Sequence, residues 1–213
     1  MRLRKKPWIK DEIITYDRWV VNEPNEYRGR WDEWFQNKAP IHLELGTGKG
    51  NFVVTLAEKH ADCNFIGVEI KEEVLIAAVR KSVEKGLKNI AFLWFNINDI
   101  EDVFAKDEVS RIYLNFSDPW PKNRHAKRRL THRGFLEKYK KILNKGGQIH
   151  LKTDNEPLFE FSLNEFSEQG FQLRNITFDL HNSRFEEAKK VMTEYEQRFV
   201  KQGLKIYRFE AVV

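Results

Sequence analysis

From residue 41 onward, short apolar stretches alternate with segments whose apolar residues recur every three to four positions. The short stretches are typical of buried strands, and the longer spacing is typical of helices that cover them. This alternation predicts an α/β fold with a mostly parallel seven-stranded sheet, because parallel strands are joined by helical crossovers. The expected strands are residues 41–45, 64–69, 90–95, 111–116, 148–153, 171–179 and 205–213, the last two forming an antiparallel hairpin with a long insertion.

Helices are expected at residues 51–58, 71–84 and 155–167. A further helix is expected to begin at a Thr131 cap and to stop at Gly146-Gly147, because a hydroxyl caps a helix start and glycine ends one. No internal repeat, low-complexity tract or linker interrupts the pattern. We therefore expect one domain over residues 1–213, with residues 1–40 as a basic N-terminal extension and helical segment.

Composition narrows the class of protein. The chain has 213 residues, of which 41% are hydrophobic and 13% aromatic, which argues against disorder. A lone cysteine, Cys63, excludes a disulfide framework, and the six histidines show no metal-ligand spacing. The first residues lack the apolar segment of a signal peptide, and no apolar run reaches the roughly 18–20 residues of a membrane span. We expect a soluble, cytoplasmic protein without a metal.

The net charge of +5 is small, but its distribution is uneven. Residues 122–133 carry six Lys or Arg and no acid, and residues 1–10 carry five and no acid. Concentrated positive segments on a nearly balanced chain predict that a polyanion docks on one face. The alternative is a solvated charged loop.

A glycine-rich turn, GTGKG, follows the first expected strand. Parallel sheets bind ligands at the carboxyl ends of their strands, so residues placed there are candidates. The turn lacks the P-loop pattern, and its third glycine comes one residue early for a dinucleotide fingerprint. Acid-x-Gly-x-Gly-x-Gly, here Glu44, Gly46, Gly48 and Gly50, resembles the first motif of class I S-adenosylmethionine-dependent methyltransferases. In that resemblance the glycines let the backbone approach the cofactor and Glu44 accepts the methionyl ammonium; the alternative is an ordinary tight turn.

Two further residues stand at strand ends. Glu69 ends the second strand, and its carboxylate can accept hydrogen bonds from both ribose hydroxyls of a nucleotide. The alternative is a Glu that faces solvent, but we expect its neighbours Val68 and Ile70 to be buried. Asn96 follows the third strand, where methyltransferases of this class commonly have an acid that meets adenine. The Asn96 amide oxygen can accept the same bond without charge; closing a turn is the alternative.

The fourth strand leads into SDPWPKNRHAKRR. This stretch resembles bacterial tRNA (guanine-N7-)-methyltransferases, and the resemblance extends from RLRKKPW through GTGKG and KTDN to MTEYE. It implies a Rossmann-like fold, S-adenosylmethionine as cofactor, and methyl transfer to N7 of a guanosine in the tRNA variable loop. Asp118 is then the catalytic residue and a cofactor contact, held by Pro119 and Pro121. For Trp120 we favour packing over base stacking.

The resemblance also implies contacts with the substrate by Lys122, by Asp154, and by Thr193, Glu194, Tyr195 and Glu196. Structural alternatives remain, since Asp154 could cap a helix and Thr193-x-x-Glu196 fits a capping box. The basic run, with RNA contacts expected at Arg124, His125, Lys127, Arg128 and Arg129, would hold the tRNA backbone.

Two other function classes fit part of the chain. A methyltransferase of proteins or small molecules would keep the glycine turn without needing the basic run, and a non-catalytic RNA-binding subunit would keep the run without needing Glu44 and Glu69. The chain has both the glycine turn with its two acids and the basic run, which favours the tRNA enzyme. We expect it to act as a monomer or homodimer without an obligatory protein partner.

Overall fold

The computed structural model describes residues 8–213 and divides the chain into two compact units, which meet in the sequence at Phe104 and Ala105. The basic residues expected to bind polyanions between positions 1 and 7 lie outside the described residues. Over residues 8–213 the strands follow the order β3-β2-β1-β4-β5-β7-β6. Three of these strands belong to the first unit and four to the second. The expectation of a single domain over residues 1–213 stays a prediction.

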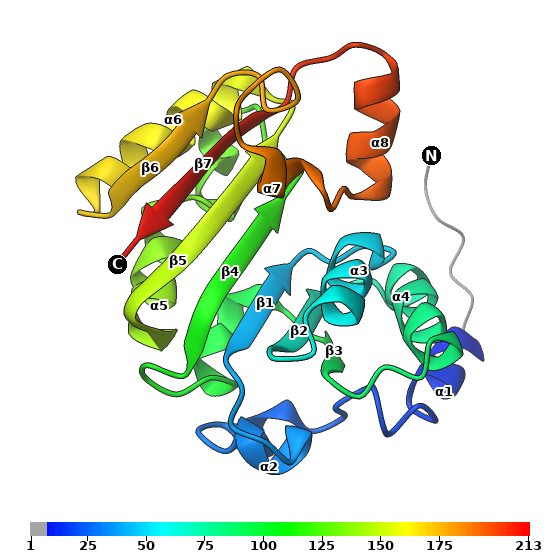
Figure 1. Ribbon diagram of the computed structural model, residues 1–213. Helices are drawn as coiled ribbons and strands as arrows, with labels where there is room; N and C mark the ends of the chain where they lie inside the picture. Colours follow the sequence, from blue (N-terminus) through cyan, green and yellow to red (C-terminus); the bar gives the residue numbers. More distant parts are fainter. Residues whose placement is uncertain (1–7) are drawn as a thin grey trace. The chain divides into compact units, whose positions relative to one another are not determined.

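The first unit is a parallel sheet with helices packed on it (Figure 1). β1 is buried along its whole length, as expected for a strand covered on both faces. Helix α3 contacts β2, and α4 contacts β2 and β3. The elements are α1 Trp8–Ile13, η1 Pro24–Tyr27, α2 Trp31–Phe35, β1 Ile41–Leu45, α3 Asn51–Lys59, β2 Asn64–Glu69, α4 Glu72–Glu84, β3 Ile90–Trp94 and the 3₁₀ helix η2 Ile97–Asp102.

The segment before β1 protects the edge of this sheet. Val21 donates its N–H to the carbonyl of Phe92 at 3.1 Å, and Phe92 donates to Trp19 at 2.7 Å. An exposed strand edge is a template for unwanted pairing, and this short bridge covers part of β3. Trp31 of α2 is also buried and donates its indole N–H to the carbonyl of Val103 at 3.1 Å.

The second unit combines a parallel pair with an antiparallel hairpin (Figure 1). β4 pairs with β5 in parallel, and β7 lies antiparallel between β5 and β6, as expected for a hairpin closing the sheet. Helix α5 packs on β5, and α6 packs on β6 and β7. The elements are β4 Val109–Asn115, η3 Asn123–Arg128, α5 Arg133–Ile142, β5 Leu143–Thr153, α6 Glu156–Glu168, β6 Gln172–Thr177, α7 Glu186–Lys189, α8 Glu194–Lys201 and β7 Tyr207–Val212.

Residues 178–206 form the insertion of the hairpin, which carries α7 and α8 (orange to red in Figure 1). Leu180 closes its base by donating its N–H to the carbonyl of Ile206 at 2.7 Å. None of the helices within residues 8–213 is long and apolar enough to span a membrane.

Candidate functional site

The turn after β1 presents open backbone. Gly46 and Gly48 have φ of +80° and +59°, and no atom lies within 4 Å of where a Cβ would stand on either. The N–H groups of Gly46 and Thr47 donate to the carbonyl of Val68 at 2.9 and 3.0 Å, which fixes the turn to the end of β2. Left-handed backbone suits glycine, and the absence of side chains here lets a ligand approach the main chain.

Gly50 has a different reason to be glycine. Its φ is +78°, and a Cβ would stand 2.2 Å from the Cβ of Ala78 on α4. Gly50 therefore allows α3 and α4 to pack closely, and this contact alone accounts for the residue. The expected cofactor contact at Gly50 stays a prediction.

Glu69 is joined to the glycine turn. Its Oε2 accepts the N–H of Gly48 at 3.1 Å, and its Oε1 accepts those of Ile70 and Lys71 at 3.0 and 3.1 Å. A carboxylate has about four acceptor positions, so capacity remains for a ligand hydroxyl. Ile70 is 56% exposed, so the expectation that it is buried is wrong. Glu44 lies within β1 and is 2% exposed.

Asn96 closes a turn. It is exposed, and its Oδ1 accepts from the backbone N–H and from the side-chain amide of Asn98, at 3.1 and 3.0 Å. These bonds cap η2. The structure thus gives Asn96 the turn-closing role, and its oxygen already accepts two bonds within the protein.

The loop after β4 carries the exposed Asp118 between two strained residues. Phe116 and Trp120 have φ of +52° and +41°, in the left-handed region. This conformation costs a residue other than glycine about 1–2 kcal/mol. Such strain persists where the surroundings enforce it, and it collects at functional sites. The strain therefore supports a functional role for this loop.

Arg129 helps to hold this loop in its strained conformation. Its Nε donates to the carbonyl of Pro119 and its Nη2 to that of Trp120, each at 3.0 Å. Its guanidinium also lies 4.3 Å from the ring centre of Phe161, and the residue is 9% exposed. These contacts direct Arg129 into the protein, and an RNA contact by this residue does not fit its burial.

The remaining cations of the run face outward. Arg124, Lys127 and Arg128 are exposed on η3, as is Lys122 at its start. Trp120 packs among them: its ring lies edge-on to that of His125 at 5.8 Å, and the guanidinium of Arg128 lies 4.9 Å from its centre.

Asp154 and Tyr195 lie close to one another. Asn155, and not Asp154, caps α6, because the Oδ1 of Asn155 accepts the N–H of Leu158 at 2.9 Å. Burial, and next the charge of Asp154, raise the pKa of Tyr195 above its ordinary value. The Tyr195 ring is 46% exposed and lies 5.3 Å from that of Phe116, two residues before Asp118. The structure thus brings together the segments that carry Asp118, Asp154 and Tyr195.

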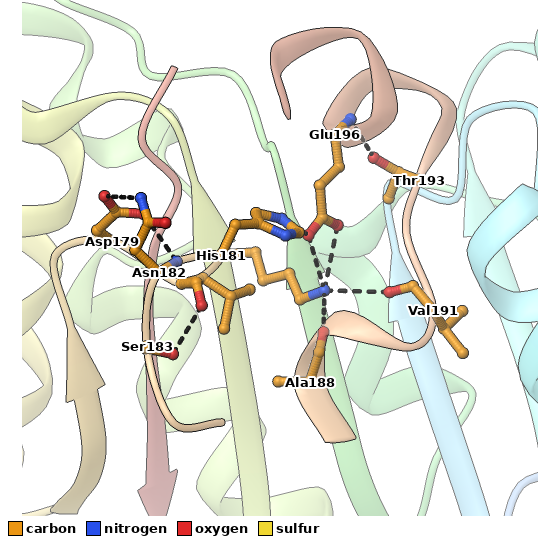
Figure 2. Close-up of polar contacts among 10 residues, drawn as sticks. Asp179, His181, Asn182, Ser183, Ala188, Val191, Thr193 and Glu196 are labelled. Carbon is orange, nitrogen blue, oxygen red and sulfur yellow. Dashed lines mark hydrogen bonds and ion pairs between the residues drawn. The ribbon is translucent and has the colours of Figure 1, made fainter. Parts of the chain in front are cut away.

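Glu196 is buried among other residues of the second unit (Figure 2). The Oγ1 of Thr193 accepts its backbone N–H at 2.9 Å, which is one half of the expected capping box. The carboxylate turns instead to Lys152, at 3.1 Å from both oxygens, and to His181 at 3.0 Å. Neither Lys152 nor His181 was predicted from the sequence as part of the site. For Lys152 the available signal was a charged residue near the end of a buried strand, in KTDN.

The chain is similar to known methyltransferases in sequence and in fold. A sequence model of the family described as "Putative methyltransferase" matches residues 38–209. Among solved structures, the 16S rRNA methyltransferase KamB matches with a TM-score of 0.63 at 14% identity, over 85% of this chain and 91% of that one. A SAM-dependent methyltransferase from Aquifex aeolicus matches with a TM-score of 0.57 at 15% identity, over 99% and 100%. These likenesses confirm the expected Rossmann-like methyltransferase fold.

Curated relatives are much closer in sequence. The tRNA (guanine-N(7)-)-methyltransferase of Brevibacillus brevis is 54% identical over 99% of this chain and 98% of its own. The proteins of that name from Geobacillus kaustophilus and Clostridioides difficile are 52% and 50% identical, over 97% and 98% of their lengths and 100% and 99% of this chain. The chain belongs to the tRNA (guanine-N(7)-)-methyltransferase family, whose members are S-adenosylmethionine-dependent enzymes.

Proposed function

We propose that this chain transfers a methyl group from S-adenosylmethionine to N7 of the guanosine at position 46, in the tRNA variable loop. The observation that carries the proposal is the identity of about half its residues, over the full length, to enzymes named for guanine N7 in tRNA. The exposed Asp118 on a strained loop, followed by exposed cations, supports it.

The residues of the first unit fit the cofactor. Gly46 and Gly48 offer backbone that no side chain covers, and Glu69 presents a carboxylate fixed beside that backbone. Glu69 would accept a hydrogen bond from a ribose hydroxyl at the acceptor position that its three N–H bonds leave open, and Glu44 would accept one from the methionyl ammonium. When bound, S-adenosylmethionine supplies an electrophilic methyl group on a sulfonium.

The acceptor needs no general base. Guanine N7 has an in-plane lone pair at neutral pH and no proton to remove. The reaction requires N7 to be held in line with the methyl carbon at about 3–3.5 Å. As the methyl group is transferred, positive charge develops on the purine, and the Asp118 carboxylate would stabilise it. The same carboxylate can accept the guanine N1–H and amino donors.

The second unit would hold the tRNA. Lys122, Asp154, Thr193, Glu194 and Tyr195 would contact the target nucleotide, as the family resemblance implies. Arg124, His125, Lys127 and Arg128 would contact phosphates, which position an RNA without reading its sequence. We expect the protein to act in the cytoplasm as a monomer or homodimer.

The experiment that tests this function is incubation of the purified protein with methyl-labelled cofactor and one of three acceptors: unmodified tRNA, a protein extract freed of nucleic acid, or DNA. Label in the tRNA alone supports the proposal. Label in the protein or DNA fraction indicates a methyltransferase of another class. Binding of tRNA without any transfer of label indicates a non-catalytic RNA-binding subunit.

A further inference from the structure

A buried lysine joins three segments of the second unit. Lys152, next to the last residue of β5, is 5% exposed. Its ammonium donates to the carbonyls of Ala188 and Val191 at 2.7 and 3.1 Å, and to both carboxylate oxygens of Glu196 at 3.1 Å. Ala188 belongs to α7, Val191 to the link after it and Glu196 to α8, so one side chain ties both helices of the insertion to the sheet.

Glu196 completes the cluster from the other side. It is fully buried, and its Oε1 also contacts the Nε2 of His181 at 3.0 Å. Figure 2 shows the side chains of His181 and Glu196 pointing toward one another, with the carbonyls of Ala188 and Val191 nearby. His181 itself belongs to a turn in which Asp179 accepts from Asn182 at 2.9 Å.

A buried ion pair of this kind adds little to the stability of the fold. Removing two charges from water costs about as much as their attraction returns, so apolar replacements are often as stable. A buried pair can instead specify one arrangement of the segments it joins. The insertion needs such a device, because its helices are short: α7 is 4 residues long and α8 is 8.

The arrangement that the pair specifies includes Tyr195. Tyr195 precedes Glu196 in the first turn of α8, and its half-exposed ring lies against that of Phe116 and stacks on that of Phe199 at 4.5 Å. A shift of Glu196 therefore moves Tyr195 relative to Phe116 and to the loop that carries Asp118.

We propose that Lys152 and Glu196 are positioning residues for the acceptor guanosine: their buried pair holds Thr193–Tyr195 in place beside the Asp118 loop, and neither side chain contacts the substrate. This inference rests on the proposed function and deepens it, because it replaces a direct substrate contact by Glu196 with an indirect role.

The test compares two double variants within the same insertion. Lys152→Met with Glu196→Leu removes the buried pair without leaving a lone charge, and a change of this kind is often tolerated by the fold. Lys190→Met with Glu187→Leu makes the same changes in an exposed ion pair of that insertion and serves as the control. Thermal unfolding, cofactor affinity by calorimetry and kcat/KM for tRNA are measured for each.

We expect the buried-pair variant to unfold near the wild-type temperature and to bind cofactor with wild-type affinity. Its kcat/KM for tRNA should fall by about tenfold to a hundredfold, since small misplacements of aligning residues cost that much. The control should match the wild type. A stable buried-pair variant with wild-type kcat/KM would overturn the proposal. Should that variant fail to fold, Lys152→Met with Glu196→Gln takes its place, because it also leaves no lone charge, and unchanged kcat/KM in it overturns the proposal equally.

Hydrogen exchange separates this inference from the proposed function. Amides of residues 191–199 should exchange faster in the buried-pair variant than in the control, without tRNA or cofactor present. If the wild type transfers no methyl group to tRNA, the proposed function fails, while the exchange result still reports whether the pair holds the segment. Unchanged exchange would show that the pair does not hold it.

Discussion

Arg128 and Arg129 are neighbours in the chain, but their guanidinium groups have different surroundings. Arg128 is exposed on η3 and lies over the Trp120 ring. Arg129 is buried and donates to the carbonyls of Pro119 and Trp120. The sequence of a basic run does not show which cation faces solvent and which one holds a loop. The difference depends on which backbone carbonyls the fold brings within reach of each side chain.

Replacing Arg129 with Lys should loosen the Asp118 loop. An ammonium cannot reproduce the planar fork that reaches both carbonyls, and each lost charge-assisted bond is worth about 1.5–3 kcal/mol. We expect lower stability to denaturant and a lower kcat, with unchanged cofactor affinity. Arg128→Ala should leave stability within about 0.5 kcal/mol and weaken tRNA binding. An Arg129→Lys protein with wild-type stability and kcat would refute the role assigned to Arg129.

Glu69→Ala should weaken cofactor binding by about 1–3 kcal/mol, because the hydrogen bond to a ribose hydroxyl is lost. Calorimetry on the folded variant measures the change. Glu58→Ala removes an exposed acid paired with Lys85 and is the control, for which we expect wild-type affinity. Equal affinities for the Glu69 variant and the control would remove Glu69 from the cofactor site.

At the scale of single elements, periodicity located the strands and the helices α3 to α6 but misplaced several ends, and it gave no helix for α7 or α8. His132, and not Thr131, caps α5, since its Nδ1 accepts the N–H of Gly134 at 3.1 Å. Gly146 and Gly147, expected to stop that helix, lie inside β5, which already begins at Leu143. Val109 pairs with Leu143 and Arg111 with Gln148, so the residues between them bulge out of the pairing. The helix thus ends at Ile142, where pairing of Leu143 with Val109 begins the strand, and the two glycines lie in the bulge.

Two glycines of the turn should respond differently to alanine. Gly50→Ala forces a Cβ against Ala78 and strains a positive φ, and we expect a loss of unfolding free energy of about 2–5 kcal/mol. Gly46→Ala meets open space, so we expect about 1–2 kcal/mol from its φ and weaker cofactor binding. Denaturant unfolding and calorimetry measure both variants. A Gly50→Ala protein as stable as Gly46→Ala would contradict the packing role.

For the whole molecule, the alternation of strands and helices was enough to predict the fold class, and the comparisons confirm it. The placement of Glu69 beside the glycine turn followed from the rule that parallel strands end at the same edge. The pair of Lys152 and Glu196 could not be predicted, because its partners are 44 residues apart and meet through a folded insertion. Sequence spacing locates residues on strand ends, whereas side-chain partners across an irregular segment depend on its full path.

Binding of tRNA should depend on salt through the exposed cations of the run. Changing Arg124, Lys127 and Arg128 to Ala should weaken binding and reduce the slope of log affinity against log salt by about two to three, since each phosphate contact contributes about 0.7–0.9. Cofactor affinity should stay level. Changing the exposed Lys59, Lys88 and Lys106 to Ala removes the same charge elsewhere and is the control. If both triple variants show the same slope, the run is a solvated loop.

The central claim, methyl transfer to N7 of a variable-loop guanosine with the aid of Asp118, is tested most directly by mapping the product. Unmodified tRNA is incubated with the protein and S-adenosylmethionine and then cleaved chemically at 7-methylguanosine. We predict cleavage at the single guanosine of position 46 with the wild type, and little cleavage with Asp118→Asn, which keeps the shape of the side chain and removes its charge. Cleavage at another position, no cleavage, or a full yield from the Asn variant would contradict the account.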